Sequence, residues 1–530
     1  MMSNAPSAST EKPSILSFNK STLVIWVAIS LIVVETFSGA LRYYFDMAGI
    51  SALLYLPKMG CAVLFALELL TFKTSRLFWI GLLLLLLSSQ LALLHGASLN
   101  NVGFSLFAIS PFLFAMVCSE HLINQKSLLG KCVALCLVAS VVGLLLDKYT
   151  TVPWKGYTYQ LGSIELSANR AWTADDIDRL AGFARVSNVL SIMIAIFSLY
   201  LLMFIRSRIL FAAVCVVAFF SILLTTSKTP TVAFLFTLGL LAVIRYRWTS
   251  AWIFVIAVSM GVILPAMGVI HDFDPNAASS NSGGGLASFY DRLVNTWPHL
   301  IILIANEGWS WLGVGFGMFG SAVFVSPVPH ADMLGTSDNT AVYLWAIFGF
   351  AGVFLYMLQL PLLFLLRDYS TTRMDRALLA VTFCICVISW TTDMFEVTMS
   401  NLFLGLAIGH TLNRTLSPQD NASPALALTP PSTPCRLPCP TSVEKPNESK
   451  RSPQYFRRPY GPAANRHNPR RRRLHRRGRH PLDGVPNPTE TRPAIRRRRG
   501  HHVRARRCLL VDRRTCAQSA AYPSVVGNVP

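Results

Sequence analysis

The chain of 530 residues is 52% hydrophobic and only 14% charged, with a mean hydropathy of +0.46 and a net charge of +21. Water-soluble globular domains do not combine so much apolar with so little charged sequence, so that class of protein is excluded. Residues 415–530 hold 24 of the 47 Lys and Arg but only 6 of the 26 acidic residues. Residues 1–414 therefore form a nearly neutral, apolar body that requires lipid as its solvent.

Apolar runs fill this body. A transmembrane helix needs about 20 apolar residues to cross a hydrocarbon core of about 30 Å. The sequence therefore predicts an all-α polytopic membrane protein with about 12 transmembrane helices in residues 22–414. Ten is the alternative number, because Asp393 and Glu396 interrupt the last two runs. The runs lie near residues 22–40, 50–72, 77–95, 102–119, 128–146, 186–205, 208–225, 229–244, 250–270, 341–366, 376–394 and 396–412.

The distribution of Lys and Arg predicts the orientation of the chain, since short basic loops stay on the cytoplasmic side of a membrane. Basic residues occur in alternate connections, so we expect residues 1–21 and both ends of the body to be cytoplasmic. Two long connections, residues 147–185 and 271–340, then lie on the outer face, and long loops usually carry function. The basic connections contain Lys73, Arg76, Lys126, Lys131, Arg206, Arg208, Arg245, Arg247, Arg367, Arg373 and Arg376.

Residues 415–530 have a different composition, with 18 of the 30 prolines and two runs of four arginines, 470–473 and 496–499. Such a segment cannot bury an apolar core, so we expect a disordered, basic cytoplasmic tail. Arginine clusters attract phosphate, which leaves an anchor to anionic lipid or an RNA-binding arm open. The favoured interpretation gives the tail no function and the protein no nucleic acid partner, because this composition is expected of GC-rich sequence translated out of frame.

The cysteines indicate neither a disulfide framework nor a metal site. Seven of the eleven lie in apolar runs, where a free thiol behaves as a small hydrophobic group. The pairs Cys384/Cys386 and Cys435/Cys439 lack the further Cys or His ligands of a zinc site. We therefore expect no metal and no cofactor.

The first polar segment is RLAGFARVSN, from Arg179 to Asn188, at the end of the first long loop. Arg179 and Arg185 can hold a diphosphate through paired hydrogen bonds, which a lysine ammonium does less specifically. Two alternatives stay open. Both arginines can anchor the membrane interface, or Arg179 can pair with an aspartate of residues 175–178 in a helical turn capped by Thr173.

The second segment runs from Phe289 to Gly320. Residues 291–306 have the apolar spacing of an amphipathic helix that lies along a membrane interface, with Arg292 at its start facing the outer aqueous layer. The glycines that follow match a dinucleotide-binding fingerprint only formally, since no strand is expected before them. We expect a tight glycine turn at the membrane surface, anchored by Trp309 and Trp311.

The third segment, from Ser337 to Tyr356, leads from polar residues into a span. Asp338, just before this span, can accept a proton from a sugar hydroxyl, or it can cap the helix that follows. His330 and His271 are the other candidate bases in this loop, although a lone loop histidine is more often a solvated surface residue.

These segments occur in a recognisable order. RLAGFARVSN, TTSKTP, DRLVNTW, WLGVGFGMF and DNTAVYLW, within about residues 180–365, resemble motifs of the O-antigen ligase and polysaccharide polymerase family. The resemblance implies a multi-pass protein of the bacterial inner membrane, with residues 147–185 and 271–340 in the periplasm. The chain departs from the family at Asp338, since many ligase-type members have His before the residue that matches Asn339.

The resemblance also implies which residues act. In this family, periplasmic arginines engage undecaprenyl diphosphate-linked saccharide, and by motif matching these are Arg179 and Arg292, with Asp338 as the candidate base. Fixed guanidinium groups stabilise the charge on a departing diphosphate, and a carboxylate can remove the proton of the attacking hydroxyl. The residues expected around the substrate are Arg185, Gly182, Asn188, Asn339 and His330.

We therefore expect a polymerase that joins lipid-linked oligosaccharide repeats into an exopolysaccharide or capsule-like glycan, acting with a chain-length regulator and export proteins. The departure at Asp338 keeps open a ligase that transfers glycan to a lipid A core or another acceptor. A transporter or flippase is the alternative of another class. It would use charged residues within the spans, for which Glu35, Lys58 and Glu68 are the candidates.

Overall fold

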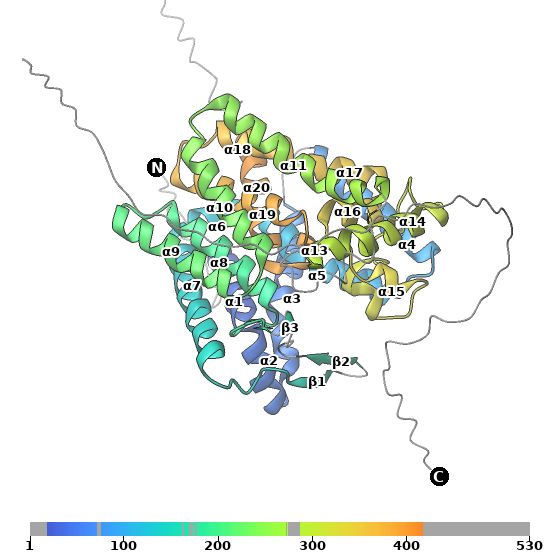
Figure 1. The fold of residues 1–530 in the computed structure, drawn as a ribbon, viewed down its shortest axis with the longest axis horizontal. Helices are drawn as coiled ribbons and strands as arrows, with labels where there is room; N and C mark the ends of the chain where they lie inside the picture. The colour runs from blue at the N-terminus through green and yellow to red at the C-terminus, as the bar shows by residue number, and fades with distance from the viewer. Residues whose placement is uncertain are drawn as a thin grey trace, which may run out of the picture. The chain divides into compact units, whose positions relative to one another are not determined.

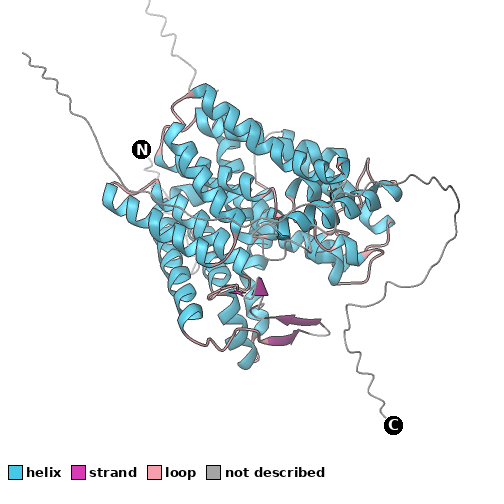
Figure 2. Ribbon diagram, viewed as in Figure 1, coloured by secondary structure: helices cyan, strands magenta, loops and turns pink. Residues whose placement is uncertain are grey.

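The computed structural model describes residues 19–71, 76–161, 164–167, 169, 173–174, 177–271, 273 and 287–416. The expectations for residues 1–18 and 417–530 concern parts of the chain outside the described residues. The described chain is almost entirely helical, apart from two short antiparallel hairpins in the first long loop (Figure 1 and Figure 2). The expected helical class is confirmed at this level.

The helices and strands have the following bounds. The α-helices are α1 (Lys20–Thr36), α2 (Ser38–Met47), α3 (Leu56–Leu69), α4 (Arg76–Leu94), α5 (Leu99–Val117), α6 (Ser119–Asn124), α7 (Lys126–Tyr149), α8 (Ser187–Leu202), α9 (Arg208–Leu224), α10 (Lys228–Val243), α11 (Arg247–Ile270), α13 (Ala287–Asp291), α14 (Trp297–Asn306), α15 (Ala331–Leu334), α16 (Thr340–Phe348), α17 (Phe350–Met357), α18 (Gln359–Asp368), α19 (Arg373–Ile388) and α20 (Thr398–Leu416). The tighter turns are η1 (Ser51–Tyr55), η3 (Gly320–Phe324) and η4 (Met394–Glu396), and η2 (Arg292–Thr296) is a π-helical turn. Strand β1 (Thr158–Leu161) pairs with β2 (Ile164–Ser167), and β3 (Thr173–Ala174) pairs with β4 (Ile177–Asp178).

Several helices are long and apolar enough to cross a membrane. Six meet both conditions among the described residues, and a seventh span results if α1 and α2, bent by 87°, are counted as one. The chain is therefore a helical, membrane-embedded protein. Each of the twelve apolar runs contains helix, but α8, α9 and α10 are shorter, so the number of twelve crossings stays a prediction. The six long spans are Ser51–Leu69, Arg76–Leu94, Leu99–Val117, Lys126–Tyr149, Arg247–Ile270 and Phe350–Asp368.

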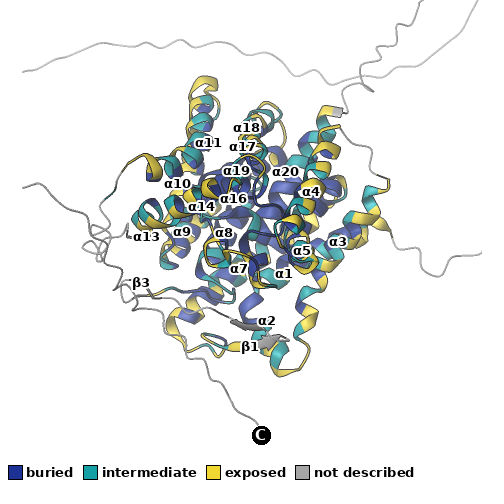
Figure 3. Ribbon diagram, turned by 90° about the vertical axis from the view of Figure 1, so that its right-hand side faces the viewer, coloured by how far each residue is buried: buried dark blue, intermediate teal, exposed yellow. Residues whose placement is uncertain are grey.

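Helices α8 and α19 form the buried centre of the described helices. Every side chain of α19 from Met374 to Ile388 is buried except that of Arg376. Apolar side chains such as Leu83 and Phe220 remain exposed on α4 and α9, and Figure 3 shows exposed residues along the outer helices around a buried centre. Large apolar patches of this kind are expected on surfaces that face lipid.

Charged residues within the apolar runs have partners. The Nζ atom of Lys58 lies 3.1 Å from Oε1 of Glu35, and the Glu68 carboxylate binds the ammonium group of Lys20 and lies 3.8 Å from His121. A paired charge in an apolar environment costs much less than an isolated one. These pairs therefore account for the three charged residues without a transport pathway.

A second ionic cluster joins the start of α19 to the end of α20. Oδ1 of Asp375 lies 2.8 Å from His410 Nε2, and its Oδ2 lies 3.0 Å from a terminal nitrogen of Arg414. Arg414 also donates to the carbonyl of Tyr369 at 3.1 Å. The Asp375 side chain is fully buried, so this cluster supplies the charge balance for a buried carboxylate.

The glycine-rich segment after α14 is packed inside the protein. The expected tight turn is present, with Gly315 at a φ of +102° and residues 313–320 all buried by other parts of the chain, and its position at the membrane surface stays a prediction. The N–H of Phe316 donates to the carbonyl and to the hydroxyl of Ser88 on α4, both at 3.0 Å. A Cβ atom at Gly315 would lie 2.4 Å from the backbone nitrogen of Ala92, so only glycine permits this close approach.

Candidate functional site

The loop of residues 336–339, just before α16, is held by a carboxylate from the connection between α19 and α20. Oδ2 of Asp393 accepts hydrogen bonds from the backbone N–H groups of Ser337 at 3.1 Å and Asp338 at 3.2 Å. Its Oδ1 accepts from the N–H of Asn339 at 2.9 Å, and the hydroxyls of Thr336 and Ser337 also donate to this carboxylate. Asp393 is buried, and it therefore fixes the backbone of the whole loop.

The environment of Asp393 changes its acidity. Burial, followed by the nearby Asp338 carboxylate, raises the pKa of Asp393 from 3.8 to about 7, while hydrogen bonds from Ser337 act in the opposite direction. Asp393 lies in the non-helical connection that follows the end of α19 at Ile388. Burial and the neighbouring carboxylate thus favour the protonated form of Asp393 more than that of an exposed aspartate.

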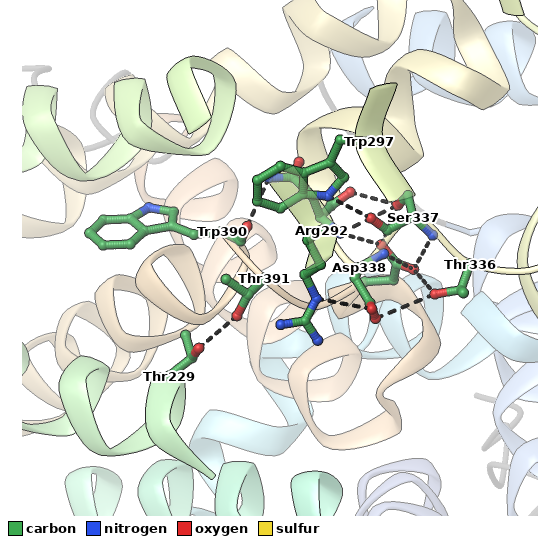
Figure 4. Close-up of polar contacts among 10 residues, drawn as sticks. Thr229, Arg292, Trp297, Thr336, Ser337, Asp338, Trp390 and Thr391 are labelled. Atoms are coloured by element: carbon green, nitrogen blue, oxygen red, sulfur yellow. Dashed lines mark hydrogen bonds and ion pairs between the residues drawn. The ribbon is translucent and has the colours of Figure 1, made fainter. Parts of the chain in front are cut away.

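Arg292 and Asp338 form an ion pair at this loop. The Nε atom of Arg292 donates to Oδ2 of Asp338 at 3.0 Å, with 22% and 39% of the two side chains exposed. Figure 4 shows the guanidinium beside Asp338, and its two terminal nitrogens have no hydrogen-bond partner among the described residues. The pairing therefore orients Arg292 and leaves two adjacent N–H donor groups for an anion.

Trp297 connects the helix that carries Arg292 to the same loop. Its Nε1–H donates to the carbonyl of Ser337 at 2.9 Å, and its side chain is fully buried (Figure 4). Leu293 and Leu300 are buried on the same side, as the amphipathic spacing predicts. The helix expected over residues 291–306 is present, but the π-helical turn η2 interrupts its regular winding at Arg292.

Asn339 has a structural role at the start of α16. Its side chain accepts a hydrogen bond from the N–H of Val342 and thereby caps α16, while its amide donates to the carbonyls of Gly261 and Trp390, each at 2.9 Å. The residue is fully buried and its amide group is engaged in these hydrogen bonds, so a contact of Asn339 with substrate stays a prediction. The alternative that Asp338 caps this helix is wrong, because Asn339 is the cap.

The TTSKTP motif touches this region from another helix. The hydroxyls of Thr229 and Thr391 are 2.7 Å apart, which joins the start of α10 to the connection that carries Asp393 (Figure 4). Thr226 in the same turn has a φ of +59°, a conformation that L-residues adopt only when their surroundings hold them. The motif thus braces the backbone next to the 336–339 loop.

The segment from Arg179 to Asn188 forms a separate, tightly held turn. The carboxylate of Asp147 at the end of α7 accepts the N–H groups of Ala181 at 2.9 Å and Gly182 at 3.0 Å, and Trp154 donates to the carbonyl of Gly182 at 2.8 Å. Gly182 has a φ of +57°, and a Cβ there would lie 2.9 Å from the backbone of Gly143. The backbone conformation and the close approach therefore explain why glycine occupies this position of the motif.

Arg179 forms no ion pair with Asp178, the one of the three preceding aspartates that the structure describes. Instead, Nζ of Lys155 lies 3.1 Å from Oδ2 of Asp178. Thr173 lies in strand β3, so the alternative of a helical turn capped by Thr173 is wrong. Residues 175 and 176 lie outside the described residues. The Nε atom of Arg179 is buried and has no hydrogen-bond partner in the part of the chain that the structure describes. Such a donor is suited to an external acceptor.

The remaining expected site residues have different surroundings. The backbone N–H of Arg185 donates to the hydroxyl of Ser38 at 3.2 Å, and Asn188 lies in the first turn of α8. His330, with a φ of +56°, is exposed, and its Nε2 is 3.6 Å from Oε1 of Glu307. Within the described ranges, neither Asn188 nor His330 forms a hydrogen bond or ion pair with Arg292 or Asp338.

The structure thus brings together Arg292, Asp338 and Asn339, and it places Arg179, Gly182 and Arg185 in a second group. No hydrogen bond or ion pair joins Arg179 or Gly182 to Arg292, Asp338 or Asn339 among the described residues. Sequence reasoning missed the central role of Asp393, which it noted only as an interruption of the last spans. An acidic residue in an apolar run is itself a signal of a functional or structural site.

An apolar cavity of about 320 Å³ lies beside the 336–339 loop. Its lining comes from α11, α14, α16 and α17 and includes Gly261, the residue whose carbonyl accepts from Asn339, together with Pro265 and Trp345. The wall is almost free of polar groups, so it suits a hydrocarbon chain better than a sugar.

The described residues contain no group of three or more His, Cys, Asp or Glu side chains suited to hold a metal ion. Comparison with protein-family models and with curated proteins finds no match for this chain. The assignment of function therefore depends on the site itself.

Proposed function

We propose that the protein is a glycan polymerase of the bacterial inner membrane that joins undecaprenyl diphosphate-linked oligosaccharide repeats at the periplasmic face. The observation that carries the proposal is the geometry of Arg292. Asp338 binds its Nε atom at 3.0 Å, and the two terminal nitrogens are left in a fork that matches two oxygens of a phosphate.

We assign the lipid part of such a donor to the apolar cavity beside the 336–339 loop. The cavity of about 320 Å³ next to Asn339 is lined by apolar side chains of α11, α16 and α17. A polyprenyl chain in this cavity would keep its diphosphate near the 336–339 loop while the saccharide stays in water. Binding of the non-reacting lipid would position the reacting bond, which contributes strongly to rate.

The proposed reaction forms one bond and breaks one. A hydroxyl oxygen of the acceptor sugar attacks the anomeric carbon of the donor, and the bond from this carbon to the diphosphate oxygen breaks. The hydroxyl proton passes to Oδ1 of Asp338, which among the described residues accepts one hydrogen bond, from the Thr336 hydroxyl at 3.4 Å. The negative charge that develops on the leaving lipid diphosphate is stabilised by the guanidinium of Arg292.

Arg179 is the second cation of the proposal. Its buried Nε atom has no partner among the described residues, so a phosphate or sugar oxygen would satisfy it. Because no contact joins Arg179 to Arg292, we assign Arg179 to binding of the saccharide-diphosphate and Arg292 to the departing charge.

Purified full-length protein, incubated with lipid-linked repeats, tests the proposal. Glycans longer than one repeat that remain linked to lipid diphosphate are the expected product. A product formed only after addition of a lipid A core would identify a ligase. Movement of donor across a vesicle membrane without new glycosidic bonds would identify a transporter, and either result would contradict the polymerase.

The orientation of the chain can be tested separately. Reporter fusions after Asp176 and after Asn281 should be active only with a reporter that works in the periplasm, as the alternation of basic loops predicts. Cytoplasmic activity at either position would contradict the proposal, because the saccharide would then lie on the wrong side of the membrane.

A further inference from the structure

A second cavity, of about 620 Å³, lies among helix ends that the basic loops assign to the cytoplasmic side. Its polar lining includes Arg245 after α10, Arg367 and Asp368 at the end of α18, and Arg376 in the first turns of α19. The connection after α10, the end of α18 and the start of α19 therefore bring three basic side chains to one place. The volume falls in the range of about 300–1,000 Å³ that is usual for ligand sites.

The charge in this cavity is not balanced by the protein. Three guanidinium groups face one carboxylate, that of Asp368, which forms no ion pair among the described residues. The nearby carboxylate of Asp375 is already bound to His410 and Arg414. The cavity consequently attracts an anion.

The two arginines at the α18–α19 connection are available for such an anion. Arg367 is half-buried and Arg376 is exposed, and neither side chain has a hydrogen bond or ion pair in the part of the chain that the structure describes. Arg245 is exposed and donates to the hydroxyl of Tyr246 at 2.6 Å, which leaves its other nitrogens accessible. Guanidinium groups bind phosphate oxygens in pairs, so the chemistry favours a phosphate over a carboxylate or a halide.

The other wall of the same cavity is apolar. Phe211 on α9 and Leu241 on α10 belong to helices whose outer side chains are exposed and apolar. A soluble phosphate would leave this wall in contact with water, whereas the glycerol and first acyl carbons of a phospholipid would cover it. Cytoplasmic leaflets are rich in anionic lipids, and basic pockets between transmembrane helices on this side are suited to their headgroups.

From this combination we propose that the cavity binds the headgroup of an anionic phospholipid, with the phosphate between Arg367 and Arg376 and the acyl chains along Phe211 and Leu241. The site is independent of the proposed polymerase activity, because none of its residues belongs to the 336–339 loop or to the Arg179 turn. It depends on the orientation of the chain only in the choice of leaflet.

Native mass spectrometry of the full-length protein in detergent, titrated with phosphatidylglycerol, tests this site. We expect a bound lipid that Arg367→Gln or Arg376→Gln weakens by about tenfold or more each, the usual effect of losing a charge-assisted hydrogen bond. The matched control is Arg208→Gln, an exposed arginine at the same helix ends that does not line the cavity. The basic residues 415–530 are present in every variant, so their attraction for lipid cancels from the comparison.

Arg367→Lys distinguishes charge from geometry and protects the test against loss of folding. It should retain part of the affinity, because the charge remains although the paired donors are lost. Equal binding of phosphatidylcholine would overturn the proposal, and so would displacement of the lipid by inorganic phosphate, which would identify a soluble-anion site. An equal loss in Arg208→Gln would also overturn it, since the lipid would then be held by general surface charge.

Discussion

Arg292 and Asp338 lie 46 positions apart in the sequence, and a hydrogen bond of 3.0 Å from Nε to Oδ2 joins them. Asp338 reaches this position with a φ of +50°, a left-handed conformation that costs an L-residue about 1 kcal/mol. Asp393 offsets this cost, because its carboxylate accepts hydrogen bonds from the backbone N–H groups of Asp338 and Asn339. The direction of the Arg292 guanidinium is therefore set by a carboxylate that does not touch it.

The first prediction separates a phosphate-binding arginine from a membrane anchor. Arg292→Ala and Arg292→Lys should each reduce polymer by about 10²–10³-fold, because lysine keeps the charge but loses the paired donors that stabilise the leaving group. Polymer yield, normalised to protein in the membrane, is the measurement. Arg208→Lys is the matched control and should remain active. Full activity of Arg292→Lys would contradict the role proposed for Arg292, since a lysine can anchor an interface equally well.

The second prediction concerns the stability that Asp393 gives to the 336–339 loop. Asp393→Ala removes the acceptor for three backbone N–H groups and should lower the free energy of unfolding by about 2–4 kcal/mol. Asp393→Asn keeps one acceptor oxygen and should have an intermediate effect. Thermal unfolding of the purified protein measures both. Asp332→Ala, an exposed residue of the same long loop, should change the stability by less than about 0.5 kcal/mol.

The third prediction is a pH dependence that belongs to Asp393. Folding raises the pKa of Asp393 from 3.8 to about 7. Between about pH 4 and about pH 7, Asp393 is therefore protonated in the folded protein but ionised in the unfolded chain. Its contribution to stability should therefore fall as the pH rises from about 4 to about 7, and should then stay constant. Asp393→Asn has no proton to lose and should lack this fall. Parallel melting-temperature profiles for the two proteins would contradict the assignment.

The fourth prediction concerns the turn that carries Arg179. Gly182→Ala adds a Cβ 2.9 Å from the backbone of Gly143 at a φ of +57°, so steric overlap adds to backbone strain. We expect a loss of about 2–3 kcal/mol in unfolding free energy and reduced polymer. Gly156→Ala, with a φ of +71° and open space around its Cβ, should cost only about 1 kcal/mol. Equal losses in the two variants would show that the close approach at Gly182 does not matter.

The fifth prediction is that residues after Ser417 are dispensable. Truncation there keeps α20 complete and keeps the contacts of Arg414 with Asp375 and Tyr369, so membrane level and polymer should be unchanged. Arg414→Gln in the truncated chain should instead lower the free energy of unfolding by about 2 kcal/mol, because a buried carboxylate loses a partner. Loss of polymer on truncation, at a normal membrane level, would show that the basic segment has a function.

The helices could be predicted from the sequence because apolar runs and basic loops are local signals, whereas the site depends on contacts between distant segments. Arg292 and Asp338 were each recognisable as polar residues in an outer loop, but nothing local indicates that they pair. One alternative paired Arg179 with an aspartate of residues 175–178 because they are close in the sequence, but Asp178 binds Lys155 from an earlier part of the loop. Asp393 was visible only as an unfavourable residue in a span, since its three N–H partners come from another connection.

The hydrogen bonds between Ser88 and Phe316 have a consequence for the order of folding during synthesis. The two residues are 228 positions apart, and at about 5–20 residues per second the ribosome needs roughly 10–45 s to make the chain between them. During that interval α4 is already synthesised while its Ser88 hydroxyl lacks both Phe316 and the Ile347 carbonyl to which it later donates. Helix α4 therefore lacks these contacts until the glycine-rich segment has been synthesised. We expect α4 to take its final position only after that point.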